Sequence, residues 1–360
     1  MTSEFSHTFP AARGTQAGRP CYVAMCPLRL VPKIFVFNED EVPPELRAQR
    51  TLNRARVPEI ASYLCDNSTS YTLSAITASI DARVYFEPNA DTGLGQNLGL
   101  LSIPMDASIL INDGQHRRAA IEVAIQENPE LGYDNIPVLF FIDEGLERSQ
   151  QMFADLNKHA VRPSDSISTL YDRRDALAEL ARSMAKSVAV FSRLTEMEKS
   201  SISNRSTKLF TLSAIKNASK ALLSKGKDDP IEPKEIQLAV DYWSEVGANM
   251  PDWQLALDKK VATAELREQY VHAHGVMLQA MGNIGAGLIA RPKSSWGTTL
   301  QGLAKIDWAR ANPEWEGRAM HHGRISKARS SVVLTGNHIK HQLGIALTPS
   351  EQEYEESFKK

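Results

Sequence analysis

The chain has 360 residues, of which 42% are hydrophobic and 23% are charged, and its formal net charge is −2. This balance is that of a folded globular protein, and the length favours two packed units. The near-neutral charge excludes a uniformly basic nucleic-acid binder, and without a run of about 18 apolar residues no membrane span is expected. Three cysteines, Cys21, Cys26 and Cys65, are too few for a disulfide scaffold and fit a reducing cytoplasm.

The chain is predicted to contain four segments that differ in composition and hydrophobic pattern. Residues 1–20 are rich in Gly, Pro, Ser and Thr and lack the pattern of a secretory signal, so a flexible N-terminal tail is expected. Strand and helix patterns alternate over residues 21–164, which predicts an α/β domain. Helical periodicity dominates residues 165–345, and an acidic tail follows at 346–360. The predicted fold class is therefore α+β.

The elements of the first predicted domain follow from periodicity and from the positions of proline and glycine. A strand with an edge or turn at its end is expected over 21–37, and a helical pattern runs to residue 64, with Pro58 splitting it or lying in the first turn of its second part. Further strands are predicted over 71–86, around 98–113 and over 136–143, with helices after Gly114 and over 147–157. In the second domain, helices are predicted over 166–188, 211–225, 233–250 and 261–289.

A motif of chemical interest, DGQHR, lies where a predicted strand gives way to a predicted helix. The free N–H groups and the positive dipole end of a helix start form a ready anion site. Gly114 allows close approach of the backbone, Gln115 and His116 add donors, and Arg117 can clamp a phosphate through two N–H groups. Asp113 suits a helix cap, a ribose hydroxyl or a metal ion. The alternative is a well-capped helix whose His and Arg serve local packing or ion pairs.

Basic residues gather in three acid-free runs, which can place a positive face on a slightly acidic protein. The first run lies on one predicted helix face before residue 57, the second spans 199–227 and the third spans 318–341. Such side chains suit contact with a phosphate backbone, although a solvated helix face better explains any one run taken alone. The residues predicted to contact DNA are Arg47, Arg50, Arg54, Arg56, Lys199, Arg205, Lys208, Lys216, Lys220, Arg324, Lys327 and Arg329.

The stretch ILINDGQHRRAAIE around the motif resembles the DGQHR domain, a relative of the ParB and sulfiredoxin superfamily. The resemblance implies a ParB/sulfiredoxin-like N-terminal domain in which a Gly-containing turn receives nucleotide phosphates. ATP or GTP with Mg²⁺ is the cofactor that it implies, and hydrolysis stays open. Gln115 stands where sulfiredoxins have their reactive cysteine, so cysteine-based sulfinic reduction is excluded.

A second stretch, MFADLNKHAVRPSD, resembles the segment that follows the core strand in DGQHR proteins. The resemblance implies that Asn157 and Arg162 face the same phosphate site as the motif. The alternative is that Asn157 caps a helix and that Arg162 is a solvated charge.

Together with QRTLNRARVPEIASYL and EKSSISNRSTKLFTLSAI, these stretches make most of the chain resemble the DndB family of bacterial DNA phosphorothioation systems. The resemblance implies a DNA-binding transcriptional regulator of the modification operon, with double-stranded promoter DNA and other phosphorothioation proteins as partners. Two other functions stay open: an NTPase, in which Asp113, Gln115, His116 and Arg117 would be catalytic, and a non-enzymatic assembly partner of the modification enzymes. The oligomeric state is also open, a homo-oligomer included.

Several other features are interpreted as structural. The spacing of His272 and His274 does not suit a metal pair on a helix, and no metal site is predicted. The glycines of GNIGAGL at 282–288 are more often a sign of close helix packing than of a nucleotide loop. Trp296, Trp308 and Trp315 could stack on bases, but core anchors are commoner for tryptophan.

Overall fold

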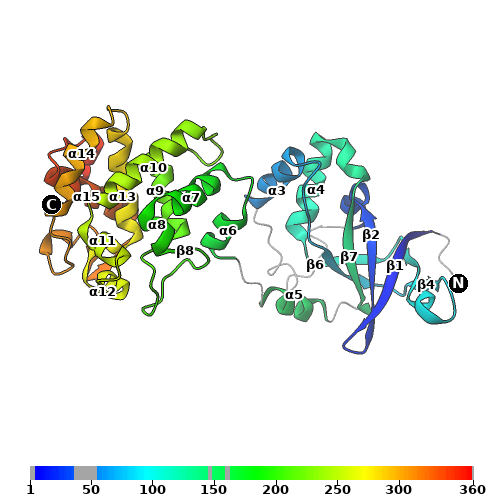
Figure 1. Cartoon of the computed structure of the whole chain (residues 1–360). Coiled ribbons are helices and arrows are strands. Elements are labelled where there is room, and N and C mark those ends of the chain that lie inside the picture. Colours follow the sequence, from blue (N-terminus) through cyan, green and yellow to red (C-terminus); the bar gives the residue numbers. More distant parts are fainter. Residues whose placement is uncertain (1–4, 36–54, 145–147, 159–162, 359–360) are drawn as a thin grey trace. The chain divides into compact units, whose positions relative to one another are not determined.

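The computed structural model describes residues 5–35, 55–144, 148–158 and 163–358. The chain forms two compact units, residues 1–161 and 162–360, each with a hydrophobic core of its own (Figure 1). The first unit combines a mixed seven-stranded sheet with helices, and the second is mostly helical. The predicted α+β class is therefore confirmed.

The first unit is built on a sheet whose spatial order is β4-β5-β1-β2-β7-β3-β6. Its strands are β1 (Ser6–Gln16), β2 (Arg19–Pro27), β3 (Ile76–Asp81), β4 (Tyr85–Pro88), β5 (Leu98–Pro104), β6 (Ser108–Asp113) and β7 (Asn135–Ile142). Strands β3 and β7 pair in parallel, and the other neighbouring strands pair antiparallel. Alternate residues of β7, Ile136, Val138 and Phe140, are fully buried, as expected for a strand that packs one face on a core.

Helices α3 and α4 cover one face of this sheet. The helical elements of the first unit are η1 (Leu28–Leu30), α1 (Val31–Ile34), α3 (Arg56–Asp66), η2 (Gly93–Asn97), α4 (Gln115–Glu127), η3 (Pro129–Tyr133) and α5 (Ser149–Lys158). Leu64 of α3 and Ile121 of α4 share a core with Ile76 and Ile80 of β3, which places α3 and α4 on that face. Pro58 lies in the first turn of α3, where its missing N–H costs no hydrogen bond.

The prediction of a flexible tail over residues 1–20 is wrong for its described part. Residues 6–16 form β1, which pairs with β2 on one side and with β5 on the other. Phe9 and Ala11 alternate with exposed residues and enter the core, so the segment has the period of a half-buried strand. Small residues and Pro10 hide this period in the sequence, and β5, far along the chain, supplies half of the pairing.

The second unit is a bundle of helices around a large aromatic core. Its helical elements are α6 (Asp165–Tyr171), α7 (Ala176–Ser187), α8 (Ala189–Leu194), α9 (Leu212–Leu222), α10 (Pro233–Ala248), α11 (Pro251–Leu257), α12 (Thr263–Gln269), η5 (Val271–Ala273), α13 (Gly275–Leu288), α14 (Ser294–Leu300), η6 (Gln301–Lys305), η7 (Pro313–Trp315), α15 (Arg329–Gln342) and α16 (Pro349–Phe358). Two short strand pairs, β8 (Thr195–Glu196) with β9 (Phe210–Thr211) and β10 (Met320–His321) with β11 (Arg324–Ile325), complete it.

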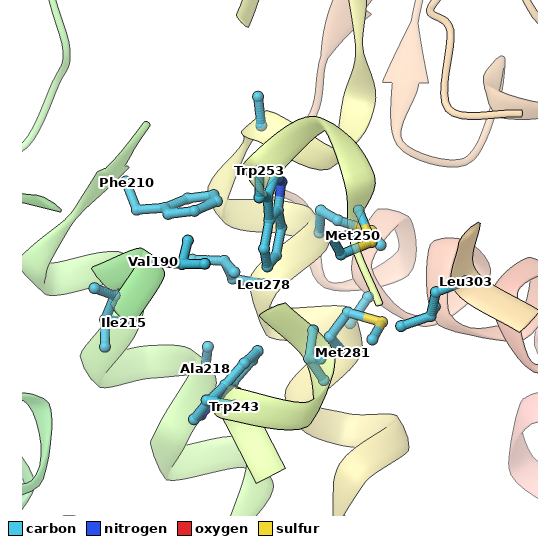
Figure 2. Packing of buried hydrophobic residues seen from close by; sticks show 14 of the residues in the cluster. Val190, Phe210, Ile215, Ala218, Trp243, Met250, Trp253, Leu278, Met281 and Leu303 are labelled. Carbon is cyan, nitrogen blue, oxygen red and sulfur yellow. The ribbon is translucent and has the colours of Figure 1, made fainter. Parts of the chain in front are cut away.

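Figure 2 shows part of this core, in which Trp243 and Trp253 lie among Phe210, Leu278 and Met281. All five tryptophans of the chain belong to this unit and are buried, which agrees with the interpretation of Trp296, Trp308 and Trp315 as core anchors. No described helix has both the length and the apolar character needed to cross a membrane.

Glycines on α13 let this helix approach its neighbours closely. A Cβ at Gly282 would overlap the carbonyl oxygen of Ala218 on α9, and a Cβ at Gly285 would meet the ring of Tyr242 on α10. At exposed Gly287, near the end of the same helix, a Cβ would meet nothing within 4 Å. Close helix packing is therefore the role of Gly282 and Gly285.

The predicted acidic tail forms helix α16, which packs on α15 and makes ion pairs with Lys340 of α15 and with Arg318, a residue before β10. Glu355 pairs with Arg318 at 2.5 Å between carboxylate and guanidinium, and Glu351 pairs with Lys340 at 2.6 Å. The Arg318 guanidinium also lies over the ring of Phe358. Two cations of the third basic run are thus neutralised within the unit.

Candidate functional site

The DGQHR motif lies at the junction between β6 and α4, as the sequence predicted. β6 ends at Asp113, and Gly114 is the N-cap of α4 with φ of 113°. A side chain at this position would be strained by the backbone conformation and would also press on Ile76 and Arg117. Among the described residues no side chain caps the helix, and its first turn contains no acidic residue, so no acidic side chain of that turn offsets the positive dipole end.

Arg117 is held in place by two oxygen atoms. Its Nη2 lies 2.6 Å from the Asp113 carboxylate and 3.0 Å from the carbonyl oxygen of Ala75. Its Nε is buried and has no hydrogen-bond partner among the described residues. A buried donor without a partner is costly, so the orphaned Nε is a feature that an incoming acceptor would relieve.

Gln115 points away from the helix start. The side chain is buried, and its amide donates to the carbonyl oxygen of Ile111 at 3.4 Å. Its role in this conformation is local, within the turn between β6 and α4.

His116 of the motif is affected by the charge of Arg56, a residue of the first basic run. Burial and then the charges of Arg56 and Arg117 lower the pKa of His116, against an opposing effect of Asp113. The imidazole is therefore neutral at pH 7 and offers one N–H and one acceptor nitrogen. Exposed Arg56 begins α3, so a cation from an element far away in the sequence acts electrostatically on the motif.

Helices α3 and α4 run side by side in the same direction. At their starts Arg56 acts on His116, and at their ends Cys65 of α3 donates to the carbonyl oxygen of Ala124 on α4. The positive dipole ends of both helices therefore lie together, beside Arg56 and Arg117. This region, defined by Arg56, Gly114, His116 and Arg117, is called the cationic pole below, and its charges and its helix start suit a phosphate.

A buried polar network supports the motif from the strand side. Asn112, which is 0% exposed, donates to the hydroxyl of Ser79 at 2.7 Å and accepts from the hydroxyl of Ser149 at 2.7 Å. The β3–β6 register shifts beside it, since Thr77 pairs with Asp113 and Ala78 with Ile111. The irregularity turns Asn112 toward the start of α5 and fixes the end of β6 from which the motif departs. This residue was not identified from the sequence, although a single Asn near the end of an apolar strand can indicate a buried polar contact.

Replacing Asn112 by Ala should lower the free energy of unfolding of the first unit by about 2 kcal/mol, because two buried hydroxyls lose their partner. Since every tryptophan lies in the second unit, tryptophan fluorescence should report an unchanged transition there while far-UV circular dichroism reports the loss. Ser102→Ala, on the exposed Thr8–Ser102 hydrogen bond, is the matched control and should change little. Equal stability of the Asn112 and Ser102 variants would contradict the role given to the network.

Some predicted site residues lie outside what the structure describes. Arg47, Arg50, Arg54 and Arg162 fall in undescribed stretches, and the side chain of Asn157, at the end of α5, is also outside the described set. Their predicted placement at the phosphate site or on DNA stays a prediction.

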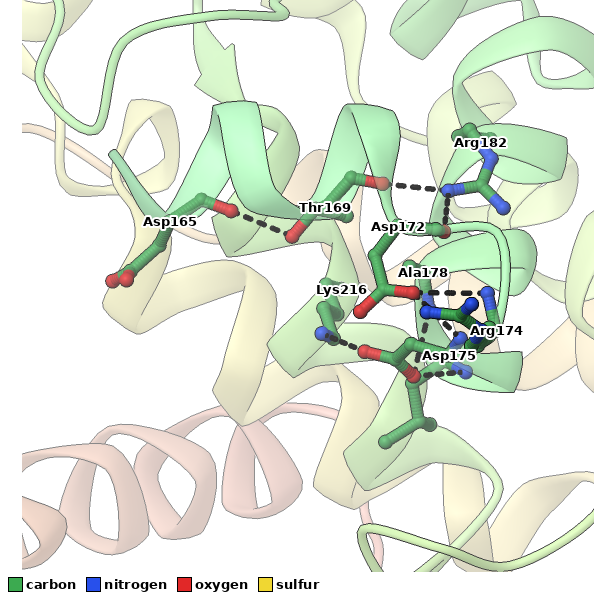
Figure 3. Close-up of polar contacts among 9 residues, drawn as sticks. Asp165, Thr169, Asp172, Arg174, Asp175, Ala178, Arg182 and Lys216 are labelled. Atoms are coloured by element: carbon green, nitrogen blue, oxygen red, sulfur yellow. Dashed lines mark hydrogen bonds and ion pairs between the residues drawn. The ribbon is translucent and has the colours of Figure 1, made fainter. Parts of the chain in front are cut away.

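The second basic run divides into engaged and exposed cations. Lys216 pairs with Asp175, the N-cap of α7, as Figure 3 shows. Burial raises the pKa of Asp175, but the hydrogen bond and charge of Lys216 outweigh it, so the pKa of Asp175 is lowered. Lys208 donates to the carbonyl oxygen of Arg193 at 2.8 Å, and Lys220 is half-buried. Lys199 and Arg205 are exposed.

The third run keeps three exposed cations, Arg324, Lys327 and Arg329. Its other cations, Arg318 and Lys340, are paired with α16. Among the described residues, the predicted DNA contacts with exposed side chains are Arg56 in the first unit and Lys199, Arg205, Arg324, Lys327 and Arg329 in the second.

The histidines that were set aside have structural partners. His272 is fully buried, accepts from the indole N–H of Trp253 at 3.1 Å and lies 2.9 Å from the carboxylate of Asp252. Within the described parts of the chain, no group of three or more His, Cys, Asp or Glu side chains could hold a metal ion.

Comparison with known proteins gives one result. The family model for DndB, described as DNA-sulfur modification-associated, matches residues 9–346, which is nearly the whole chain. No curated protein and no solved structure matches.

Proposed function

Because this chain belongs to the DndB family of DNA-sulfur modification-associated proteins, we propose that it is a DNA-binding regulatory protein of a bacterial DNA phosphorothioation system. Its proposed ligand is the double-stranded promoter DNA of the modification operon, and its proposed partners are other proteins of that system. The likeness of the first unit to the ParB and sulfiredoxin superfamily stays a prediction.

The observation that carries the proposal is the cationic pole. Exposed Arg56 contributes a positive charge from α3, Arg117, which pairs with Asp113, lies on α4, and Gly114 begins α4 without a side chain of its own. Arginines and backbone N–H groups at helix starts are the donors that proteins most often direct at phosphate oxygens. Exposed cations in both units supply further contacts of the kind that a duplex needs, although the net charge of the chain is slightly negative.

The same pole fits a nucleotide phosphate, so we include ATP or GTP with Mg²⁺ in the proposal as a regulatory ligand. The orphaned Nε of Arg117 and the N–H groups of the first turn of α4 would hold the phosphate. The bound nucleotide would contribute negative charge and would compete with DNA phosphates for these donors.

Binding is better supported than hydrolysis. The acid of the motif, Asp113, already accepts from Arg117, and Gln115 is turned back toward β6. A hydrolytic site needs groups that orient water and a metal ion, and these two side chains are engaged elsewhere. The experiment below therefore distinguishes a DNA-binding regulator from two alternatives, an NTPase and a non-enzymatic assembly partner.

Replacing Arg56 by Gln should weaken DNA binding about tenfold at 0.1 M salt, because one phosphate contact and its released counterion are lost. The measurement is fluorescence anisotropy with labelled duplex from the operon promoter. Arg83→Gln is the matched control, since Arg83 is in the same unit, is 92% exposed and makes only a long 3.7 Å contact with Glu144.

The outcomes separate the three functions. An affinity that Arg56→Gln lowers and Arg83→Gln leaves alone supports a DNA regulator whose contact is at the cationic pole. Absence of DNA binding, together with ATP turnover that Arg117→Ala abolishes, would replace the regulator by an NTPase. Absence of both, with co-purification of the modification enzymes, would leave the assembly role.

A further inference from the structure

The second unit contains a cavity of about 470 Å³. Its wall combines the start of α13, the start of α9, helix α12 and the segment between β8 and β9. Its described lining residues are Ser200, Ser201, Ile202, Asn204, Leu209, Phe210, Thr211, Ala214, Ala264, Arg267, Glu268, Ala273, His274, Gly275, Arg310 and Lys327. Volumes of this order are typical of sites for small molecules.

Two half-buried arginines of the cavity have no acidic partner among the described residues. Arg267 donates to the backbone carbonyl oxygens of Ser203, Asn204, Ser206 and Lys208. Arg310 donates to the backbone carbonyl oxygens of Glu268 at 3.1 Å and Gly323 at 2.7 Å. Carbonyl oxygens position a guanidinium but leave its charge uncompensated, so an anion is the missing partner.

The charge of the lining is positive. Arg267, Arg310 and Lys327 contribute three positive charges, and Glu268 contributes one negative charge, which leaves a net charge of two. Burial, opposed by a hydrogen bond to Arg267 and assisted by the charge of Arg310, lowers the pKa of His274 to about 4, so this lining residue is neutral at pH 7. The contribution of Arg310 to this lowering reflects the positive potential in this part of the unit.

Helix α13 adds to this potential. It has 14 residues, its N-cap His274 provides no side-chain cap, and its first turn contains no acidic residue. Gly275, the first residue of the helix, lines the cavity, so the positive dipole end opens into it.

The rest of the lining suits an organic group rather than a bare ion. An apolar wall is formed by Ile202, Leu209, Phe210, Ala214 and Ala264. Ser200, Ser201 and Asn204 add polar side chains beside it. A few polar groups around an apolar wall are the usual composition of a site that orients a small organic ligand.

We propose that this cavity binds a phosphate-bearing ligand, a nucleotide, with its phosphate between Arg267, Arg310 and Lys327 and its base or sugar against the apolar wall. The inference does not rest on the proposed DNA function, since it is argued from the lining of this cavity, although Lys327 is also a proposed DNA contact. The same phosphate chemistry is offered by a free nucleotide and by the phosphorylated end of a nucleic-acid strand, and the experiment separates these sources.

The test is isothermal titration calorimetry on the full chain with ADP, with inorganic phosphate, and with a short oligonucleotide carrying or lacking a 5′-phosphate. Lys327→Gln removes one lining charge from an exposed side chain, so it should leave the fold intact and weaken binding about tenfold. Arg310→Gln should weaken binding further, and Arg310→Lys should restore part of it. Lys305→Gln is the matched control, because Lys305 is an exposed cation of the same unit that does not line the cavity and is not a proposed DNA contact.

Saturable binding of ADP that follows this order of variants supports a free nucleotide as the ligand. Binding of the oligonucleotide only when it carries the 5′-phosphate supports a strand end. No saturable binding of any probe to the wild type, or equal binding by the wild type and the Lys327 and Arg310 variants, would overturn the proposal. Tryptophan fluorescence of each variant verifies that the second unit is folded.

Discussion

Raising the salt concentration from 50 mM to 200 mM should weaken DNA binding by this protein about a thousandfold, if about six phosphates are neutralised in the complex. Among the described residues, six of the predicted DNA contacts have exposed side chains: Arg56, Lys199, Arg205, Arg324, Lys327 and Arg329. Each cation that neutralises a phosphate releases counterions from the duplex, so the logarithm of the affinity falls linearly with the logarithm of the salt concentration. The measurement is fluorescence anisotropy over a salt series.

The slope of log affinity against log salt concentration distinguishes cations that neutralise a DNA phosphate from cations that do not. Arg205→Gln should reduce the slope by about one unit if its guanidinium neutralises one phosphate. Lys216→Gln should leave the slope unchanged, because Lys216 is already paired with Asp175. An affinity that hardly changes with salt would remove the phosphate-backbone basis of the proposed function.

Replacing Gly282 by Ala should lower the free energy of unfolding of the second unit by about 3 kcal/mol, since backbone must move to admit one methyl group. The added Cβ would overlap the carbonyl oxygen of Ala218 on α9, and backbone gives way less easily than the end of a flexible side chain. Replacing Gly287 by Ala, on the same helix, should instead raise the free energy of unfolding by about 0.5 kcal/mol. The helix loses a flexible residue, and the added Cβ has no atom within 4 Å.

The two substitutions add the same atoms to the same helix, so their difference isolates packing against α9. Chemical denaturation followed by tryptophan fluorescence measures the pair, because all five tryptophans are buried in the second unit. If both substitutions changed the free energy of unfolding equally, the close packing of α13 against α9 would contribute little to the stability of the second unit.

The sequence predicted those elements whose pattern is local. The strand over residues 136–143 is marked by a continuous apolar run, and the helix after Gly114 and the second half of the chain have helical patterns. The structure has β7, α4 and the helices of the second unit there. The strand β1 was missed, because its evidence is tertiary: both of its edges are filled by β2 and β5.

In the candidate sites, too, features with a local sequence pattern could be predicted, and features that depend on tertiary packing could not. The DGQHR motif is contiguous, and the turn at Gly114 could be predicted from it. The approach of Arg56 to His116 depends on the packing of α3 on α4, which no local pattern contains. Arg267 and Arg310 lie outside the basic runs, and only the fold brings them to one cavity with Lys327.

The order of strands in the first unit also governs how the chain can fold during synthesis. β1 and β2 leave the ribosome first, yet the partner of β2 on its other side is β7, which ends at Ile142. A two-stranded hairpin is barely stable alone, and its open edges invite pairing with other chains. The nascent first unit must therefore remain incomplete until β7 has emerged, whereas neighbouring helices of the second unit can form contacts soon after they are made.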